Sequence, residues 1–368
     1  MSSKEGALYL DKGPMQTKKS VSMPIWLKAL IALLPALFFL LLFTIFPIFN
    51  TTFIAFVKDF YFQGGTGSIA LASYLRQLDM YNNPEWWAEY FRIVEPDVPF
   101  LRPYKPIIGF ANFAYVLKDP LFRNALLNTA ILTIISVPLT IMISLLLAVS
   151  LNSIKPLRAT YQTIFFLPYV TNGIALGMVF NTIFSHEVGG IMNQFIQFFG
   201  GKPVSWIRPL WDGGGGTIPL SKFSLGFAIT VQSIWAGLAF KILVFMSGLA
   251  SIDRQYYDAA RIDGSNRSTI FRRITVPLLS PQILYITITS FIGAFKAYQS
   301  VISIVGGGPI HFGGETRTLW ITVVGYIYMN RNVEPNIPLA AAGSVILLVI
   351  ILFITLIQMQ VSKKRVHY

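Results

Sequence analysis

The sequence predicts an all-α protein that crosses a membrane six times. Only 12% of its 368 residues are charged and 54% are hydrophobic, whereas a soluble domain carries about 25% charged residues. Six apolar stretches reach the ~20 residues that a spanning helix needs. Lysine and arginine gather at the ends of these stretches, so the formal charge of +13 indicates a membrane surface and not nucleic acid.

The first apolar stretch follows a lysine-bearing segment and is longer than the ~7–15 residues of a signal peptide. Because no small-residue cleavage site follows it, we expect a retained anchor. Prolines within the stretches are compatible with membrane helices whose neighbours satisfy the freed carbonyls. The predicted spans are residues 26–50, 124–151, 161–184, 223–250, 278–304 and 338–360.

The cations predict the orientation. They concentrate in both tails and in the short loops after the second and fourth spans, and such loops stay cytoplasmic. Both termini are therefore expected in the cytoplasm of a multi-pass cell-membrane protein. The expected parts are a cytoplasmic tail (1–25), a first membrane helix (26–57), an external loop or cap (58–121), a membrane core (122–360) with a cytoplasmic loop (251–277), and a cytoplasmic tail (361–368).

The loop after the fourth span is polar and predicted to be helical. Asp253 suits a helix N-cap, and Gly264 suits the left-handed position that ends a helix. Ser265 is expected to cap a second helix, and Pro277 to open the next span. This predicts a helix–glycine–helix knob. Three interpretations are possible: a solvated loop, a DNA-binding helix pair, or a docking element. The docking element would expose Tyr256, Tyr257, Ala259 and Ala260.

The loop resembles the coupling loop of binding-protein-dependent ABC importers. That loop reads Glu-Ala-Ala, three residues, Gly, nine residues, then Ile-x-Leu-Pro. Here the sequence has Asp258-Ala259-Ala260, then Gly264, then Ile274-Thr275-Val276-Pro277. Over residues 106–360, stretches such as "FFLPYVTNGIALGMVFNTIF" resemble sugar permeases of the maltose and glycerol-phosphate type. The resemblance implies a type I ABC importer permease fold and a transport function, without catalytic residues.

The resemblance also implies the partners. These are a second homologous permease, two ATP-binding subunits, an extracytoplasmic solute-binding protein, a sugar and membrane lipid. This chain would hold no cofactor, since it has no Walker motif and the partner subunits would bind ATP and Mg. The residues expected to couple it to the ATPase are Tyr257, Asp258, Ala259, Ala260, Asp263, Gly264, Ile274 and Pro277.

A solute site is expected in the spans, with helix packing as the alternative for each residue. The family motif implies Tyr169, Gly173, Gly237, Phe240 and Ser290. Polar or stacking side chains nearby add Asn172, Trp235, Lys296, Tyr298 and Gln299. The family's asparagines in the fifth span are absent here, where alanines and Lys296 stand. The spacing Gly173-x-x-x-Gly177 also suits close helix contact.

Two rival functions find less support. An ion-coupled secondary transporter would place acidic residues within spans, and spans two to six contain none. A membrane enzyme would need a catalytic set, and none is seen; three histidines lack metal-ligand spacing. The solute stays open between a neutral or acidic oligosaccharide and a sugar phosphate. Lys296 would meet an acidic solute or reach the outer interface, whereas Lys241 would extend to the cytoplasmic interface.

Overall fold

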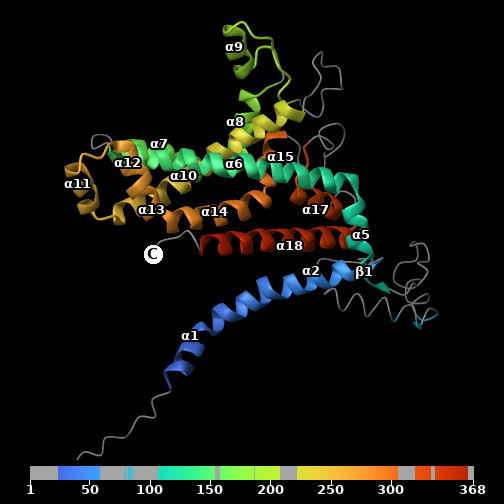
Figure 1. Ribbon diagram of the computed structural model, residues 1–368. Helices are drawn as coiled ribbons and strands as arrows, with labels where there is room; N and C mark the ends of the chain where they lie inside the picture. Colours follow the sequence, from blue (N-terminus) through green and yellow to red (C-terminus); the bar gives the residue numbers. More distant parts are fainter. Residues whose placement is uncertain are drawn as a thin grey trace, which may run out of the picture. The chain divides into compact units, whose positions relative to one another are not determined.

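The protein is almost entirely helical in the part that the computed structural model describes (Figure 1). The described residues are 24–58, 79, 82, 83, 85, 107–153, 158–185, 187–207, 222–305, 320–332 and 336–363. The one sheet within these ranges pairs two short antiparallel strands, β1 (Val57–Lys58) and β2 (Ile107–Ile108). Most of the predicted external segment 58–121 lies outside the described residues.

Four helical runs are long and apolar enough to cross a membrane, and two bent helix pairs bring the number to six if each pair is one span. The long runs are Trp26–Phe56, α6 (Pro120–Ser153), α10 (Lys222–Ser251) and α18 (Ile337–Ser362). These counts refer to the described residues. The predicted all-helical, polytopic class is therefore confirmed.

The N-terminal run divides into α1 (Ile25–Leu40), a π-helical turn η1 (Leu41–Ile45) and α2 (Phe46–Phe56). The π-helical turn lies just before Pro47, which has no N–H to donate. The described residues of this run up to Phe49 belong to a unit separate from the rest. The leucine and phenylalanine side chains of this unit are exposed, as expected of a helix that faces lipid.

The third span is not the continuous helix 161–184 that the sequence predicts. It consists of α7 (Arg158–Val170) and α8 (Gly173–Ile183), bent by 106°. Pro168 weakens the end of α7 because it cannot donate a backbone hydrogen bond. Asn172 then starts α8 as its N-cap, its side-chain oxygen accepting from the Ile174 N–H at 2.9 Å. This cap satisfies one of the amides that the break frees.

The fifth span also departs from the predicted helix 278–304. The helical segment Arg267–Leu278 is bent by 68° against α14 (Ser280–Phe295). After α14 the chain breaks and resumes as α15 (Gln299–Val305). The segment 278–304 is therefore two helices with a short joint, and Lys296 and Tyr298 lie in that joint.

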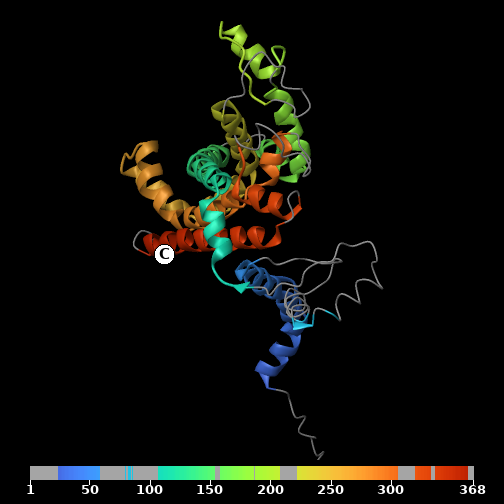
Figure 2. The ribbon, with the colours of Figure 1, turned by 90° about the vertical axis from the view of Figure 1, so that its right-hand side faces the viewer.

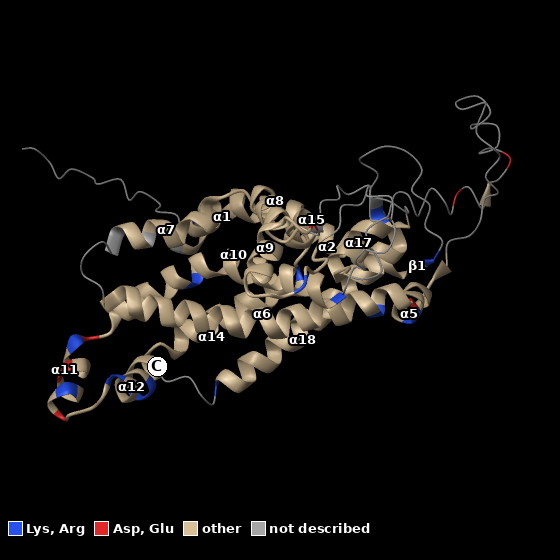
Figure 3. Ribbon diagram, turned by 90° about the horizontal axis from the view of Figure 1, so that it is seen from above, with Lys and Arg blue, Asp and Glu red and all other residues tan. Residues whose placement is uncertain are grey.

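The long helices form one bundle around α6. Figures 1 and 2 show α6, α10, α14 and α18 running along a common direction. Side chains pack between α6 and both α10 and α14, and between α14 and α18. Figure 3 shows charged residues concentrated on α11 and α12 at one end of the bundle and near α5 and β1 at the other. This distribution is typical of helices that cross an apolar layer.

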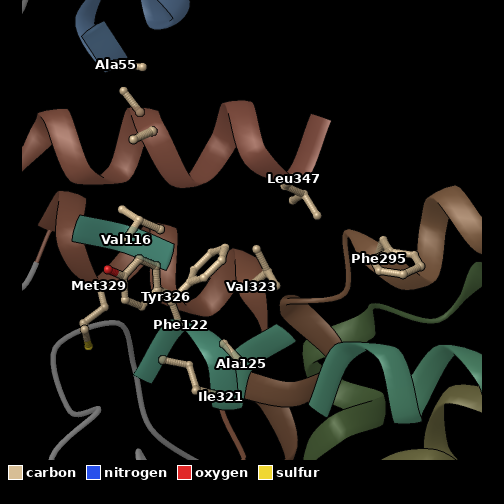
Figure 4. Close-up of a cluster of buried hydrophobic side chains, with 12 residues drawn as sticks. Ala55, Val116, Phe122, Ala125, Phe295, Ile321, Val323, Tyr326, Met329 and Leu347 are labelled. Carbon is tan, nitrogen blue, oxygen red and sulfur yellow. The ribbon is translucent and has the colours of Figure 1, made fainter. Parts of the chain in front are cut away.

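A cluster at the second of these ends fixes α5 (Ala111–Lys118) and α17 (Val323–Asn332) to the bundle (Figure 4). Phe122 and Tyr326 meet edge to face with ring centroids 5.2 Å apart. The Tyr326 hydroxyl donates to the Asp119 carboxylate at 2.8 Å. Burial, and then this hydrogen bond, raise the pKa of the Tyr326 phenol, which keeps the phenol protonated as the donor. Asp119 also accepts from the Leu121 N–H and so starts α6 earlier than predicted.

Candidate functional site

The predicted knob exists and begins with the expected cap. Helix α11 (Arg254–Ile262) follows Asp253, whose carboxylate accepts from the Gln255 N–H at 3.0 Å. Gly264 ends the turn with φ +73°, a conformation in which other residues are strained. The Gly264 N–H donates to the Arg261 carbonyl and the Ser265 N–H to the Ala260 carbonyl. This is the hydrogen-bond pattern of a Schellman C-cap, so the glycine is required by backbone geometry.

The second helix of the knob starts one residue later than predicted. Asn266, not Ser265, is its N-cap, because the Asn266 side chain accepts from the Thr269 N–H at 2.8 Å. The Ser265 amide is already used in closing α11. Helix α12 (Arg267–Ile270) continues into a π-helical turn η2 (Phe271–Thr275) and α13 (Val276–Leu278). Pro277 lies in α13, within the helical segment Arg267–Leu278, and the next membrane helix α14 begins at Ser280. The prediction that Pro277 opens that helix is therefore wrong.

The knob is anchored to the bundle by its inner side. The Tyr257 hydroxyl lies 3.4 Å from Thr275 Oγ1. Ala260 is 8% exposed, so the prediction that it is exposed is wrong. A larger side chain at this position would collide with the packed inner side of the knob. Phe271 and Val276 pack against the cluster at the ends of α6, α10 and α14, which links the knob to three spans.

The outer side of the knob is a compact exposed surface. It includes Tyr256, Ala259 and Ile262. Asp258 is also exposed, and its carboxylate accepts from the Arg261 guanidinium at 3.2 Å. Asp263 is the exposed C-cap residue of α11, while Ile274 is half-buried within η2. The surface therefore offers apolar contacts beside a paired carboxylate.

Two of the predicted solute residues meet across α7 and α10. The rings of Tyr169 and Phe240 stack with centroids 6.1 Å apart and 19° between their planes. The Tyr169 side chain is 56% exposed. Trp235, also on α10, is exposed as well. These aromatic side chains are accessible, as stacking on a sugar ring requires.

A second group joins α8 to α15. A methyl group built on Gly173 would lie 3.7 Å from the side-chain nitrogen of Gln299, so these two predicted residues are close neighbours. Gly177 contacts Ser303 so tightly that a built methyl group would come within 2.9 Å of the Ser303 carbonyl carbon. The small-residue spacing on α8 thus serves helix packing at Gly177. Asn172 uses its side-chain oxygen to cap α8.

Gly237 lies under a lysine of its own helix. The Lys241 ammonium donates to the Gly237 carbonyl at 3.1 Å. A methyl group built on Gly237 would lie 3.0 Å from that nitrogen and 3.2 Å from Thr140 Cγ2 of α6. The Lys241 side chain therefore turns back along α10 and does not extend straight to an interface. Gly237 is part of the α6–α10 contact.

The remaining solute residues are separate from these pairs. Tyr298 stacks on Tyr328 with centroids 4.9 Å apart, which favours packing over ligand contact. Lys296 is exposed in the joint after α14, and Ser290 is half-buried on α14. Within the described ranges, no group of three His, Asp or Glu side chains is placed to hold a metal.

A cavity of about 430 Å³ opens between α7 and α10. It is almost wholly apolar, with Thr163 as its polar contribution. A sugar needs hydrogen-bond partners, so this cavity does not suit one. Its lining residues are Thr163, Phe165, Phe166, Leu167, Val170, Ala239, Ile242, Leu243 and Met246.

The matched family agrees with this geometry. Residues 140–367 match the binding-protein-dependent transport system inner membrane component. The chain belongs to this family. It is a multi-pass inner-membrane permease of an ABC importer that works with a binding protein, and ATP is bound by partner subunits. As a permease of this family, it is not itself an enzyme.

The relatives of this permease include carbohydrate transporters. It is 31% identical over 257 residues to the arabinooligosaccharides transport system permease protein AraP of Halalkalibacterium halodurans, covering 69% of this chain and 75% of AraP. It is 29% identical over 262 residues to the sn-glycerol-3-phosphate permease UgpA of Agrobacterium fabrum, covering 71% of this chain and 82% of UgpA. A solved bacterial alginate ABC transporter shares the fold, with a TM-score of 0.67 at 19% identity, covering 92% and 94% of the two chains.

Sequence reasoning missed several residues that shape the permease. Thr140 of α6 packs against Gly237, and Ser303 of α15 packs against Gly177. Asn193 is a buried hub of the loop after α8. Thr140 and Ser303 are ordinary small residues of membrane helices, so the sequence carries no signal for their contacts. An asparagine in the loop after α8 is equally inconspicuous.

Proposed function

We propose that this permease moves a sugar or oligosaccharide from an extracytoplasmic binding protein into the cytoplasm. The knob carries the proposal: it presents a rigid, capped helix with the coupling pattern, rooted in the ends of three spans. Closure of two ATP-binding subunits would move such a knob and the spans attached to it. A second, homologous permease would complete the pathway. The names of relatives such as AraP support a sugar as the solute.

Within this function, Tyr169, Phe240 and Trp235 are proposed to contact the sugar. Stacked, exposed aromatic rings on neighbouring helices offer the apolar face of a sugar ring a matching surface. Gly173 would let the sugar approach the backbone of α8 closely, and Gln299 would offer a side-chain amide for a hydrogen bond. Lys296 is proposed to meet an acidic sugar, since no carboxylate in the described part of the chain pairs with it. The alginate named for the structural neighbour is such an acidic solute. A sugar phosphate, as for UgpA, is the second candidate.

Replacing Lys296 should separate acidic from neutral solutes. In vesicles that contain the assembled transporter, Lys296→Met should lower the uptake of an acidic oligosaccharide by about tenfold, the effect of ~1.4 kcal/mol. It should leave a neutral oligosaccharide of the same length unaffected. Uptake of radiolabelled sugars with and without ATP measures both. Equal uptake of the acidic sugar by both proteins would show that Lys296 is not its counter-charge. No uptake of any sugar by the native protein would reject the function itself.

The orientation is tested with single cysteines, because the chain has none. A cysteine at Arg267 on the knob should be protected from a membrane-impermeant maleimide in intact cells. A cysteine at Gly214, outside the described residues, should be labelled. This follows if the cation-rich segments, including both termini, lie in the cytoplasm, as we propose from the distribution of lysine and arginine. Labelling at position 267 in intact cells would contradict the arrangement.

A further inference from the structure

The loop that follows α8 carries an apolar surface that stays exposed within the part of the chain that the structure describes. Helix α9 (Ile191–Phe198) forms the centre of this external lobe, residues 187–207. Phe195, Phe198 and Phe199 are 60%, 83% and 71% exposed. Together with Ile191 they recur at helical spacing along α9, so they share one face. We call these four residues, Ile191, Phe195, Phe198 and Phe199, the aromatic face.

The opposite side of α9 fixes the lobe through side-chain hydrogen bonds. The Asn193 side chain is fully buried and donates to the Glu187 and Val204 carbonyls at 2.8 and 3.0 Å. Its oxygen accepts from the Val204 N–H and the Trp206 indole. Two exposed glutamines, Gln194 and Gln197, donate to the Gly189 and Val188 carbonyls. Side-chain amides thus satisfy loop carbonyls, as a segment in an apolar medium requires.

The lobe leaves the bundle sideways. Figures 1 and 2 both show α8 and α9 extending away from the bundle, across the direction of α6. Helix α7 has 13 residues before the 106° bend, which at 1.5 Å per residue is ~20 Å of a hydrocarbon layer ~30 Å thick. Because α6 crosses the membrane along its own axis, the lobe runs along the bilayer plane, in the outer half under the orientation proposed above.

The composition of α9 also suits lipid. The helix contains no charged residue, and in the lobe only Glu187 and Lys202, near its two ends, are charged. A water-soluble partner would be oriented by charged and polar groups around an apolar centre, and α9 offers no charge for this. An amphipathic helix with phenylalanines on one face lies at the boundary of headgroups and acyl chains.

We propose that the aromatic face of α9 is a lipid-binding surface, inserted at the headgroup–acyl boundary of the outer leaflet. The lobe would thereby anchor the outer end of the third span, in which α8 is bent by 106° against α7. Since α8 packs on α15, the anchor would steady the α8–α15 pair while the knob moves at the other end of the bundle. The proposal depends on the family's place in the membrane and not on the identity of the solute.

A photoreactive benzophenone side chain at position 198 tests this proposal. Because Phe198 is 83% exposed, an aromatic substitute there leaves the fold intact. The assembled transporter is placed in vesicles of phosphatidylethanolamine and phosphatidylglycerol, irradiated, and examined by mass spectrometry. We expect a phospholipid adduct at position 198, several-fold more abundant than at the control position Lys202, which is exposed and charged. Adducts to another protein chain, to the second permease or the binding protein, would overturn the proposal. The absence of any lipid adduct would overturn it as well.

Discussion

Gly264→Val should uncouple ATP hydrolysis from solute delivery while the chain still inserts in the membrane. Gly264 has φ +73°, and a β-branched residue in this conformation costs about 1–2 kcal/mol. The Schellman cap that joins α11 to α12 would open, and the knob would lose its shape. ATPase stimulation by loaded binding protein, measured in the reconstituted transporter, should fall by about fivefold or more, the factor that corresponds to this energy.

The chain offers a matched control for this strain. Gly200 also has a positive φ, +77°, but lies after α9, far along the sequence from the knob. Gly200→Val should impose similar backbone strain away from the knob and should lower the stimulation less than Gly264→Val does. Gly264→Asn should keep more coupling than Gly264→Val, since asparagine tolerates the left-handed region.

A second variant addresses the packing of the knob instead of its turn. Ala260 is 8% exposed, so Ala260→Trp has no room and should also lower stimulation strongly, because it displaces α11 from its inner contacts. Transporter assembly is checked by co-purification of the ATP-binding subunits. Native stimulation in both Gly264→Val and Ala260→Trp would mean that the knob does not transmit the movement.

The knob could be predicted from sequence because its signals are local. Asp253 and Gly264 act through hydrogen bonds to residues within a few positions of themselves, and their residue types are strongly selective for caps. The prediction that Ser265 is the second cap was wrong for an equally local reason. Both Ser265 and Asn266 suit an N-cap; in the structure Ser265 belongs to the turn that closes α11, and Asn266 is the residue that caps α12. Composition alone does not show that competition.

Four of the spans could be predicted as long helices, whereas the other two predicted spans are bent helix pairs. Length and apolarity identify a crossing segment, whereas the bend after Pro168 depends on what satisfies the freed backbone groups. Tyr298 shows the same limit for the solute site. Its ring was expected to meet a sugar, but it stacks on Tyr328 from α17, a residue about thirty positions away in sequence. Such long-range pairs follow from the three-dimensional packing of the bundle, which a single sequence does not reveal.

Gly177→Ala should weaken the contact between α8 and α15 strongly, although it adds one methyl group. That methyl group would collide with the Ser303 side chain and approach the Ser303 carbonyl carbon within 2.9 Å. Ser303 is part of the helix α15, so its backbone has little freedom to move. The Asn181 side chain of α8 donates to the Ile304 carbonyl of α15, and this hydrogen bond holds the two helices together. Overpacking of this kind costs about 1–3 kcal/mol. Solute uptake and the unfolding temperature of the purified transporter should both fall.

Two further variants show whether the effect of Gly177→Ala comes from packing: Gly173→Ala as a control, and Ser303→Gly as a compensating change. Gly173→Ala places its methyl group 3.7 Å from the Gln299 side chain, an ordinary contact, so its unfolding temperature should stay near the native value. Adding Ser303→Gly to Gly177→Ala removes the colliding side chain and should recover part of the lost stability, because the carbonyl carbon still lies close. If Gly177→Ala melts like the native protein, or if Ser303→Gly gives no recovery, the α8–α15 contact is not the tight one seen here. Partial recovery of uptake together with stability would show that the bent third span must be held against α15 for transport.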